Sequence, residues 1–159
     1  MKYRIISVGK IRESFYREGI NEYIKRIRKY TRVEFIDGLE EKISPNAGDK
    51  DIQKILQKEA DKILKLLKKD EILIVLDSQG KGISSEKLAE YIIDWNKSNK
   101  RGINLVIGSS FGLAERIIKQ ADMTISFSKM TFPHQMAALI LSEQVYRGFK
   151  ILKGEPYHK

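Results

Sequence analysis

The stretch EILIVLDSQGKGI, residues 71–83, decides the fold of this 159-residue chain. Its first half, EILIVL, is a nearly continuous apolar run of strand length, which is typical of a strand buried on both faces. Its second half, DSQGKGI, reads as a glycine-containing loop. A similar pair follows, where INLVI at 103–107 precedes the loop GSSFG at 108–112. The sequence therefore predicts parallel strands that end in loops at one edge of a sheet.

Amphipathic patterns separate these strands. Residues 49–69 carry an apolar stripe at helical spacing, with lysines opposite. Ser14, and either Ser84 or Ser85, are the expected helix N-caps, and Pro133 is the expected first residue of the last helix. The predicted strands are 3–8, 32–36, 71–76, 103–107 and 123–127, and the predicted helices are 15–30, 49–69, 84–95, 113–119 and 133–153. The alternation predicts one α/β domain over 1–159, with a mostly parallel sheet and helices on both faces.

The charge balance favours a nucleic-acid partner. The chain has 30 Lys and Arg against 21 Asp and Glu, a net charge of +9. With no cysteine and two histidines it offers no disulfide framework and little to build a metal site. Residues 1–16 lack the apolar core of a signal peptide, and no apolar run is long enough to span a membrane. We expect a cytoplasmic protein with no metal and no membrane partner.

Three loops leave the carboxyl ends of predicted strands: LDSQGKG at 76–82, IGSSFG at 107–112 and FSKMTFPHQ at 127–135. Ligands of open α/β sheets bind at that edge, and glycine lets backbone approach a flat heterocycle. One composite pocket is therefore predicted, although ordinary turn chemistry also accounts for each loop alone. The dinucleotide fingerprint and the P-loop are both missing, which argues against NAD and against ATP hydrolysis.

Two further segments carry side chains suited to chemistry. His134 stands at the start of the last predicted helix, as either a functional group or a capping histidine. The tail GEPYHK, 154–159, places Tyr157 beside His158, which offers stacking and proton transfer toward a base. Chain ends are more often frayed and dispensable, so the residues alone leave both interpretations open.

The helix predicted at 133–153 has apolar residues on more than one side. One stripe holds Ala138, Leu141, Val145, Phe149 and Leu152, and around it lie Met136, Leu139, Ile140 and Tyr146. A surface helix needs a single apolar face, so the excess predicts a two-fold interface between copies. Burial of the helix within its own domain is the alternative.

The chain resembles the bacterial RlmH family of the SPOUT methyltransferase superfamily. The resemblance runs from VGK at 8–10, through FSKMTFPHQ and EQVYR at 143–147, to the final GEPYHK. Two positions depart from it, with Ser109 where the family has glycine and Gly148 where it has alanine. The resemblance implies a SPOUT-type fold with a C-terminal trefoil knot and a homodimer. It also implies S-adenosyl-L-methionine as cofactor and methylation of N3 of a pseudouridine in helix 69 of 23S ribosomal RNA, in the large subunit or the assembled ribosome.

The resemblance further implies roles for single residues. The cofactor-binding positions are Leu76, Gly108, Phe127, Ser128, Lys129, Met130, Thr131 and Phe132. The catalytic candidates are His158 as the first choice of general base, His134 as the second, Tyr157 packed against the target nucleoside, and Arg147, which with Lys159 would hold phosphate or stabilise the deprotonated base. Two other functions stay open, a SPOUT methyltransferase that acts on transfer RNA and a non-catalytic ribosome-binding assembly factor.

Overall fold

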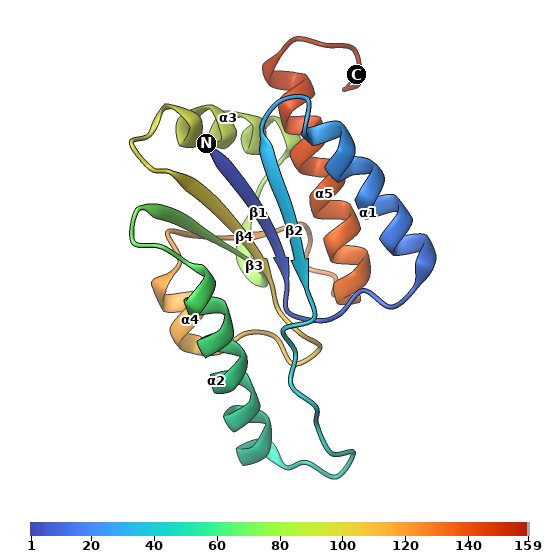
Figure 1. Ribbon diagram of the computed structural model, residues 1–159, viewed down its shortest axis with the longest axis vertical. Helices are drawn as coiled ribbons and strands as arrows, with labels where there is room; N and C mark the ends of the chain where they lie inside the picture. Colours follow the sequence, from blue (N-terminus) through green and yellow to red (C-terminus); the bar gives the residue numbers. More distant parts are fainter. Residues whose placement is uncertain (159) are drawn as a thin grey trace.

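Strands and helices alternate along the whole chain in the computed structural model, which describes residues 1–158 (Figure 1). The elements are β1 (Lys2–Ser7), α1 (Ser14–Ile27), β2 (Arg32–Asp37), α2 (Asp49–Leu66), β3 (Glu71–Gly82), α3 (Ser85–Lys97), β4 (Gly102–Ile107), α4 (Glu115–Gln120), β5 (Met123–Ser126) and α5 (His134–Leu152). The predicted order of elements is confirmed.

The five strands form one sheet in the order β2-β1-β4-β3-β5, and every neighbouring pair is parallel. All six residues of β4 are buried, as its mostly apolar sequence predicts. Successive side chains of a strand point to opposite faces, so Ile5 packs in one apolar cluster and Ile6 in the other. Helices α1, α3 and α5 cover the first face and α2 and α4 the second, which confirms the predicted layers (Figure 1).

Helix α5 lies between α1 and α3 and is packed largely within its own domain. Ala138, Leu141, Val145 and Phe149 are buried against the sheet side of the core. Close packing reaches the flanks of the helix as well, because a Cβ on Gly19 of α1 would meet Leu139 at 2.8 Å and one on Gly148 would meet Ile92 at 2.5 Å. Burial within the domain therefore accounts for the first apolar stripe. Of the excess residues that the sequence analysis assigned to a dimer interface, Leu139 and Tyr146 pack partly against this core, whereas Met136 and Ile140 do not.

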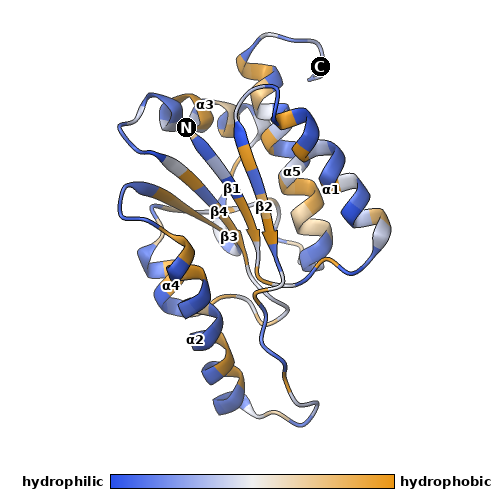
Figure 2. Ribbon diagram, in the orientation of Figure 1, coloured by the Kyte–Doolittle hydropathy of each residue, from blue (hydrophilic) through white to orange (hydrophobic). Residues whose placement is uncertain are grey.

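Hydrophobic residues gather on the strands and along α5, whereas α1 and α2 show long hydrophilic stretches (Figure 2). A buried ion pair closes the amino-terminal edge of the sheet, where Arg4 of β1 contacts Glu71 of β3, with side chains 8% and 6% exposed. The amide of Asn104 donates to the same Glu71 carboxylate at 3.1 Å. Within residues 1–158 no helix is both long and apolar enough to cross a membrane.

Some predicted boundaries were wrong. The segment 77–82, predicted as a loop, continues β3, because its end pairs with β5 after a bulge between Leu76 and Lys81. Ser14 is the first residue of α1 and not its cap; Glu13 takes the cap position and makes no side-chain capping bond. The prediction for α3 is confirmed, since the hydroxyl of Ser84 accepts from the N–H of Lys87 at 3.1 Å. The trefoil knot stays a prediction.

Candidate functional site

The three predicted loops meet at the carboxyl ends of β3, β4 and β5 and enclose a pocket of about 590 Å³. Seven of the predicted cofactor-binding residues line it: Leu76, Gly108, Phe127, Ser128, Met130, Thr131 and Phe132. The eighth, Lys129, is exposed and is not part of the lining. His134 also lines the pocket, from the first turn of α5. Sequence reasoning therefore located this pocket correctly from the strand ends.

The loop after β4 is a tight turn that forms one wall. Ser109 and Gly112 exchange backbone hydrogen bonds, with N···O distances of 3.2 and 2.9 Å. A Cβ on Gly108 would lie 2.6 Å from the backbone of Gly112, so only glycine fits where the turn closes on itself. Behind the turn, the buried carboxyl of Glu59 on α2 accepts a hydrogen bond from the Ser109 hydroxyl at 3.1 Å. Burial raises the pKa of Glu59 above its ordinary value.

The other two walls are also fixed by short-range contacts. Gly80 sits directly against the backbone of Ile125, where a Cβ would meet the Ile125 carbonyl carbon at 2.6 Å. In the loop after β5, the Ser126 hydroxyl donates to the Ser128 carbonyl at 2.7 Å. The Ser128 hydroxyl in turn accepts from the N–H of Met130 at 3.0 Å. The loop therefore keeps a defined shape although it contains no regular structure.

The pocket combines apolar walls with small polar groups. Leu76, Ile107, Ile125 and Phe127 provide flat aliphatic and aromatic surface, while serine hydroxyls and the backbone of glycine-containing turns provide hydrogen-bonding groups. Its volume lies within the range of about 300–1,000 Å³ usual for small-molecule and cofactor sites. Such a pocket suits a heterocyclic ligand of nucleoside size.

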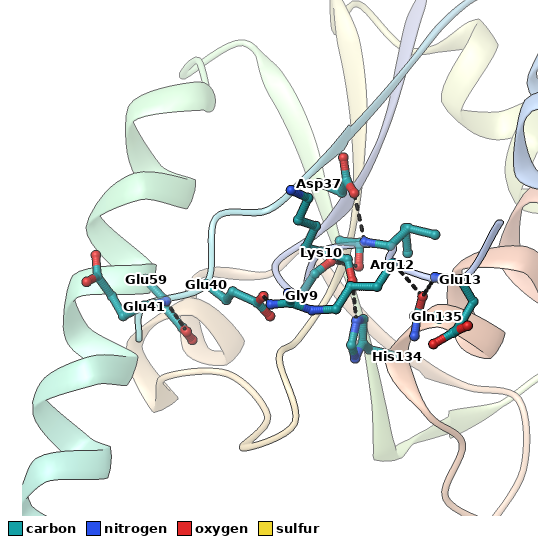
Figure 3. Close-up of polar contacts among 12 residues, drawn as sticks. Gly9, Lys10, Arg12, Glu13, Asp37, Glu40, Glu41, Glu59, His134 and Gln135 are labelled. Atoms are coloured by element: carbon teal, nitrogen blue, oxygen red, sulfur yellow. Dashed lines mark hydrogen bonds and ion pairs between the residues drawn. The ribbon is translucent and has the colours of Figure 1, made fainter. Parts of the chain in front are cut away.

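His134 is held at the edge of the pocket by the loop between β1 and α1. Its Nε2 lies 2.9 Å from the carbonyl oxygen of Lys10. The neighbouring Gln135 accepts from the backbone N–H groups of Arg12 and Glu13, at 2.7 and 3.0 Å (Figure 3). The start of α5 and the β1–α1 loop therefore form one hydrogen-bonded unit.

The tail forms a second cluster beside α5 and α3. Arg147 pairs with Glu143 at 2.6 Å and lies over the ring of Tyr157, 4.8 Å from its centroid. The hydroxyl of Tyr157 donates to Glu143 at 3.0 Å, and burial raises the pKa of Tyr157 above its ordinary value. His158 contacts Arg147 through Nδ1 at 3.3 Å and Glu86 through Nε2 at 2.7 Å. The tail is thus folded onto the domain rather than frayed.

The electrostatics of this cluster favour the charged forms of Glu86 and Arg147. Hydrogen bonds from its own backbone N–H, from Ser84 and from His158 lower the pKa of Glu86 to about 2. The hydrogen bond to Glu143 raises the pKa of Arg147. Lys159, the remaining tail residue with a predicted role, lies outside the described residues.

The structure does not bring the tail cluster to the pocket of the same chain. Arg147 lies about 20 Å along the α5 axis from His134, at about 1.5 Å of rise per residue. Among residues 1–158, Arg147, Tyr157 and His158 take no part in the pocket lining. A smaller groove of about 270 Å³, lined in part by Ile140 and Gln144, lies between the two and shares Ile125 and Phe127 with the pocket.

The sequence analysis assigned no role to three residues that support the pocket and its surroundings. Glu59 is polar but shares the buried face of α2 with Leu56 and Ile63, and that helical spacing could have identified it. Gly9 and Gln135 act across more than a hundred residues of sequence, so no local pattern reveals their contact with the other segment. Residues 1–158 contain no group of three or more histidine, cysteine, aspartate or glutamate side chains placed to share a metal ion.

Comparison with known proteins places the chain in a family. The family described as "Predicted SPOUT methyltransferase" matches residues 1–158. A protein of Syntrophomonas wolfei named "Ribosomal RNA large subunit methyltransferase H" is 63% identical over 159 residues, which cover 100% of both chains. A protein of Methanococcus maripaludis named "Putative ribosomal RNA large subunit methyltransferase H" is 49% identical with the same coverage.

A solved structure supports the fold alone. It is described as "a probable methylase family protein from Haemophilus influenzae Rd KW20" and matches with a TM-score of 0.53 at 14% identity, over 99% of this chain and 70% of that one. The full-length matches at high identity confirm the family that the sequence resemblance predicts. The chain belongs to the SPOUT methyltransferase family, within the group of ribosomal RNA large subunit methyltransferase H proteins.

Proposed function

We propose that this protein transfers a methyl group from S-adenosyl-L-methionine to N3 of a pseudouridine in helix 69 of 23S ribosomal RNA. The observation that carries the proposal is the pocket at the ends of β3, β4 and β5, formed by the FSKMTFPHQ segment and two glycine-containing turns. The names of the full-length relatives support ribosomal RNA of the large subunit as the substrate. The net charge of +9 fits a polyanionic partner. The protein would act in the cytoplasm.

The residues present fit the cofactor. Apolar side chains such as Leu76 and Phe127 offer surface for an adenine ring, and the close packing of Gly108 on the Gly112 backbone keeps the turn tight beside the pocket. The serine hydroxyls and turn backbone offer donors and acceptors for a ribose and an amino-acid group. When bound, the cofactor supplies an activated methyl group, because its sulfur is a sulfonium.

The protein's own contribution is to position the target and to manage its proton. An imide N–H must lose its proton before nitrogen attacks, so a hydrogen-bond acceptor beside it assists the reaction. Holding the two reactants in line contributes much of the acceleration in such transfers. His158 and His134 are the candidate acceptors, Tyr157 would stack on the nucleoside, and Arg147 would stabilise the deprotonated base or contact phosphate.

Tail and pocket would act together across a homodimer. They lie about 20 Å apart along α5, so the tail of one chain is better placed to complete the pocket of a second chain than its own. The half-exposed Met136 and Ile140 remain as apolar surface on α5 for such an interface. Light scattering at micromolar concentration tests the assembly, and a monomeric mass would contradict it.

Two measurements test the activity. Mass spectrometry of ribosomal RNA from a deletion strain should show loss of one methyl group at the helix 69 pseudouridine, with transfer RNA unchanged. Loss of a methyl group from transfer RNA instead would assign the enzyme to the other substrate. Isothermal titration calorimetry should show binding of S-adenosyl-L-methionine, and failure to bind it with or without ribosomes would favour a non-catalytic assembly factor.

A further inference from the structure

The hydrogen bond between His134 and Lys10 determines which nitrogen of the neutral imidazole carries the proton. A backbone carbonyl oxygen can only accept, so Nε2, at 2.9 Å from the Lys10 oxygen, must be the donor. The neutral ring then has its lone pair on Nδ1. The histidine is therefore held as a single tautomer with one free acceptor.

Gly9 packs closely against the His134 ring and limits how the ring can move. A Cβ built on Gly9 would lie 2.5 Å from Cδ2, 2.6 Å from Nε2 and 2.8 Å from Cγ of His134, so these atoms pack directly on the Gly9 backbone. Nδ1 and Cε1 are the ring atoms farther from Gly9. Because His134 lines the pocket and its Nε2 is bonded to the Lys10 carbonyl, Nδ1 is the ring nitrogen left for a ligand in that pocket.

The loop that holds His134 is itself fixed at several points (Figure 3). Asp37, at the end of β2, accepts from the N–H of Ile11 at 2.8 Å and from Arg17 at 2.7 Å. On the other side, Gln135 accepts from two successive N–H groups of the loop. The Lys10 carbonyl is thereby held in place from β2, α1 and α5, which is more than a helix start needs for its own stability.

We propose that Gly9 and the Lys10 carbonyl are positioning elements that hold His134 with Nδ1 toward the ligand, as the acceptor for one of its N–H groups. The inference rests on the proposed function only for the identity of that ligand, since the tautomer belongs to the protein alone. The N–H group is either an amino group of the methyl donor or the imide of the target base.

His158 differs from His134 because both of its ring nitrogens already have partners. His158 has both ring nitrogens engaged, with Arg147 at Nδ1 and Glu86 at Nε2. Arg147 can only donate, so the lone pair of His158 is already used. Of the two histidines, His134 is the one with an acceptor nitrogen that no described side chain or backbone group occupies.

Nitrogen-15 NMR of the imidazoles tests the tautomer directly, because the chain has only two histidines. In a His158→Gln protein, His134 is the only histidine left, so all imidazole signals come from it. At a pH where the ring is neutral, we expect Nε2 to carry the proton and Nδ1 to give the shift of an unprotonated nitrogen. An Nδ1–H tautomer or an even mixture would overturn the inference, whatever the enzyme methylates.

Substitution by glutamine separates anchoring from ligand contact. In His134→Gln the amide nitrogen can still donate to the Lys10 carbonyl, but the amide oxygen does not occupy the position of Nδ1 and cannot take up a proton near neutral pH. We expect unchanged thermal stability and a loss of about 10²-fold in either kcat or cofactor affinity, which is the scale for removal of an acid–base group. If the loss is in kcat with cofactor affinity retained, Nδ1 faces the target base; if it is in cofactor affinity, Nδ1 faces the methyl donor. Retention of both would contradict the proposal.

A Gly9→Ala variant tests the positioning by backbone. The added methyl group must push the His134 ring aside, so we expect a mixed tautomer and a loss of activity similar in kind to that of His134→Gln. Gly48→Ala is the matched control, because no heavy atom lies within 4 Å of its Cβ position. A Gly9→Ala protein that keeps both the Nε2–H tautomer and full activity would show that Gly9 positions nothing.

Discussion

The hydroxyl of Ser109 donates a 3.1 Å hydrogen bond to Glu59 and ties the pocket turn to a carboxyl that is only 3% exposed. The other carboxylate oxygen accepts from the N–H of Glu41 at 3.0 Å. Both donors are uncharged, and the structure gives Glu59 no ion pair within residues 1–158. Two hydrogen bonds from neutral groups compensate only part of the free-energy cost of burying the charged carboxylate. The neutral form is therefore favoured and the pKa of Glu59 is raised.

Replacement of Glu59 by glutamine should stabilise the protein at neutral pH. A raised pKa means that the folded state binds this proton more tightly than the unfolded state, so ionisation removes stability as the pH rises from about 4.5. The amide of Glu59→Gln can still accept from Glu41 and can donate to the Ser109 oxygen. Urea unfolding should therefore show a gain over the wild type that shrinks toward pH 4.5.

The matched variant Glu59→Ala removes both hydrogen bonds and leaves the Glu41 N–H without its partner. It should lose about 1–3 kcal/mol relative to the wild type near pH 4.5, where the folded wild type keeps Glu59 protonated, and less at higher pH, because the wild type itself loses stability as Glu59 ionises. If glutamine proves destabilising by a constant amount across the pH range, the negative charge is compensated and the explanation given for the raised pKa is wrong.

A bulkier residue at Gly108 should abolish cofactor binding. A valine there would clash with the Gly112 backbone 2.6 Å away, so the turn must open and the wall of the pocket must move. Calorimetry with S-adenosyl-L-methionine should detect no binding to Gly108→Val, while circular dichroism should show an intact fold because the turn lies outside the strands and helices. Gly48→Ala serves again as the control, and undiminished binding to Gly108→Val would place the cofactor elsewhere.

Deletion of 154–159 should abolish methyl transfer and spare cofactor binding, since no strand or helix is removed. A site shared between two chains makes a sharper prediction. Mixing the truncated protein with Gly108→Val protein should restore about a quarter of the wild-type sites, because half of randomly formed dimers are mixed and each holds one intact site. No recovery would mean that tail and pocket work in the same chain or that the subunits do not exchange, and a dissociation and reassociation step removes the second possibility.

The ion pair of Arg4 and Glu71 should matter for stability and not for chemistry. Glu71→Gln leaves the guanidinium buried without a counter-charge, and we expect a loss of about 3–5 kcal/mol in denaturant unfolding. Methyl transfer per folded molecule should be unchanged, because the pair lies at the amino-terminal edge of the sheet, opposite the pocket. Glu115→Gln, which breaks an exposed pair with Lys119, should leave the unfolding midpoint where it is.

The sequence was informative wherever burial leaves a local pattern. The apolar runs of β3 and β4 predicted parallel strands, and the ends of the strands predicted one pocket among three loops, which the structure shows. The eight expected cofactor-binding residues came from the family resemblance, and seven of them line that pocket. The sequence did not predict features that depend on contacts between distant segments of the chain. The extension of β3 to Gly82 depends on pairing with β5, and the bonds from Arg12 and Glu13 to Gln135 join segments more than a hundred residues apart.

The tail shows a different limit. The sequence alone left Tyr157 and His158 as either part of a site or a frayed end, and the structure shows Glu143, Arg147 and Glu86 holding them. Those partners lie on two helices whose relative placement only the packed core determines. Sequence alone could name the tail residues by resemblance, but it could not show that their polar atoms are already engaged with one another.

Helix α5 runs without interruption from the edge of the pocket to the tail cluster. Its length therefore fixes the angle about the helix axis between the side chains at the pocket and those at the tail. One inserted residue would turn everything beyond it by about 100° and swing the tail away from α3. Seven would nearly restore the angle but displace the tail by about 10 Å. Among homologous proteins, α5 should therefore accept changes of residue but not of length, whereas insertions should be tolerated at the exposed residues 44–46 between β2 and α2.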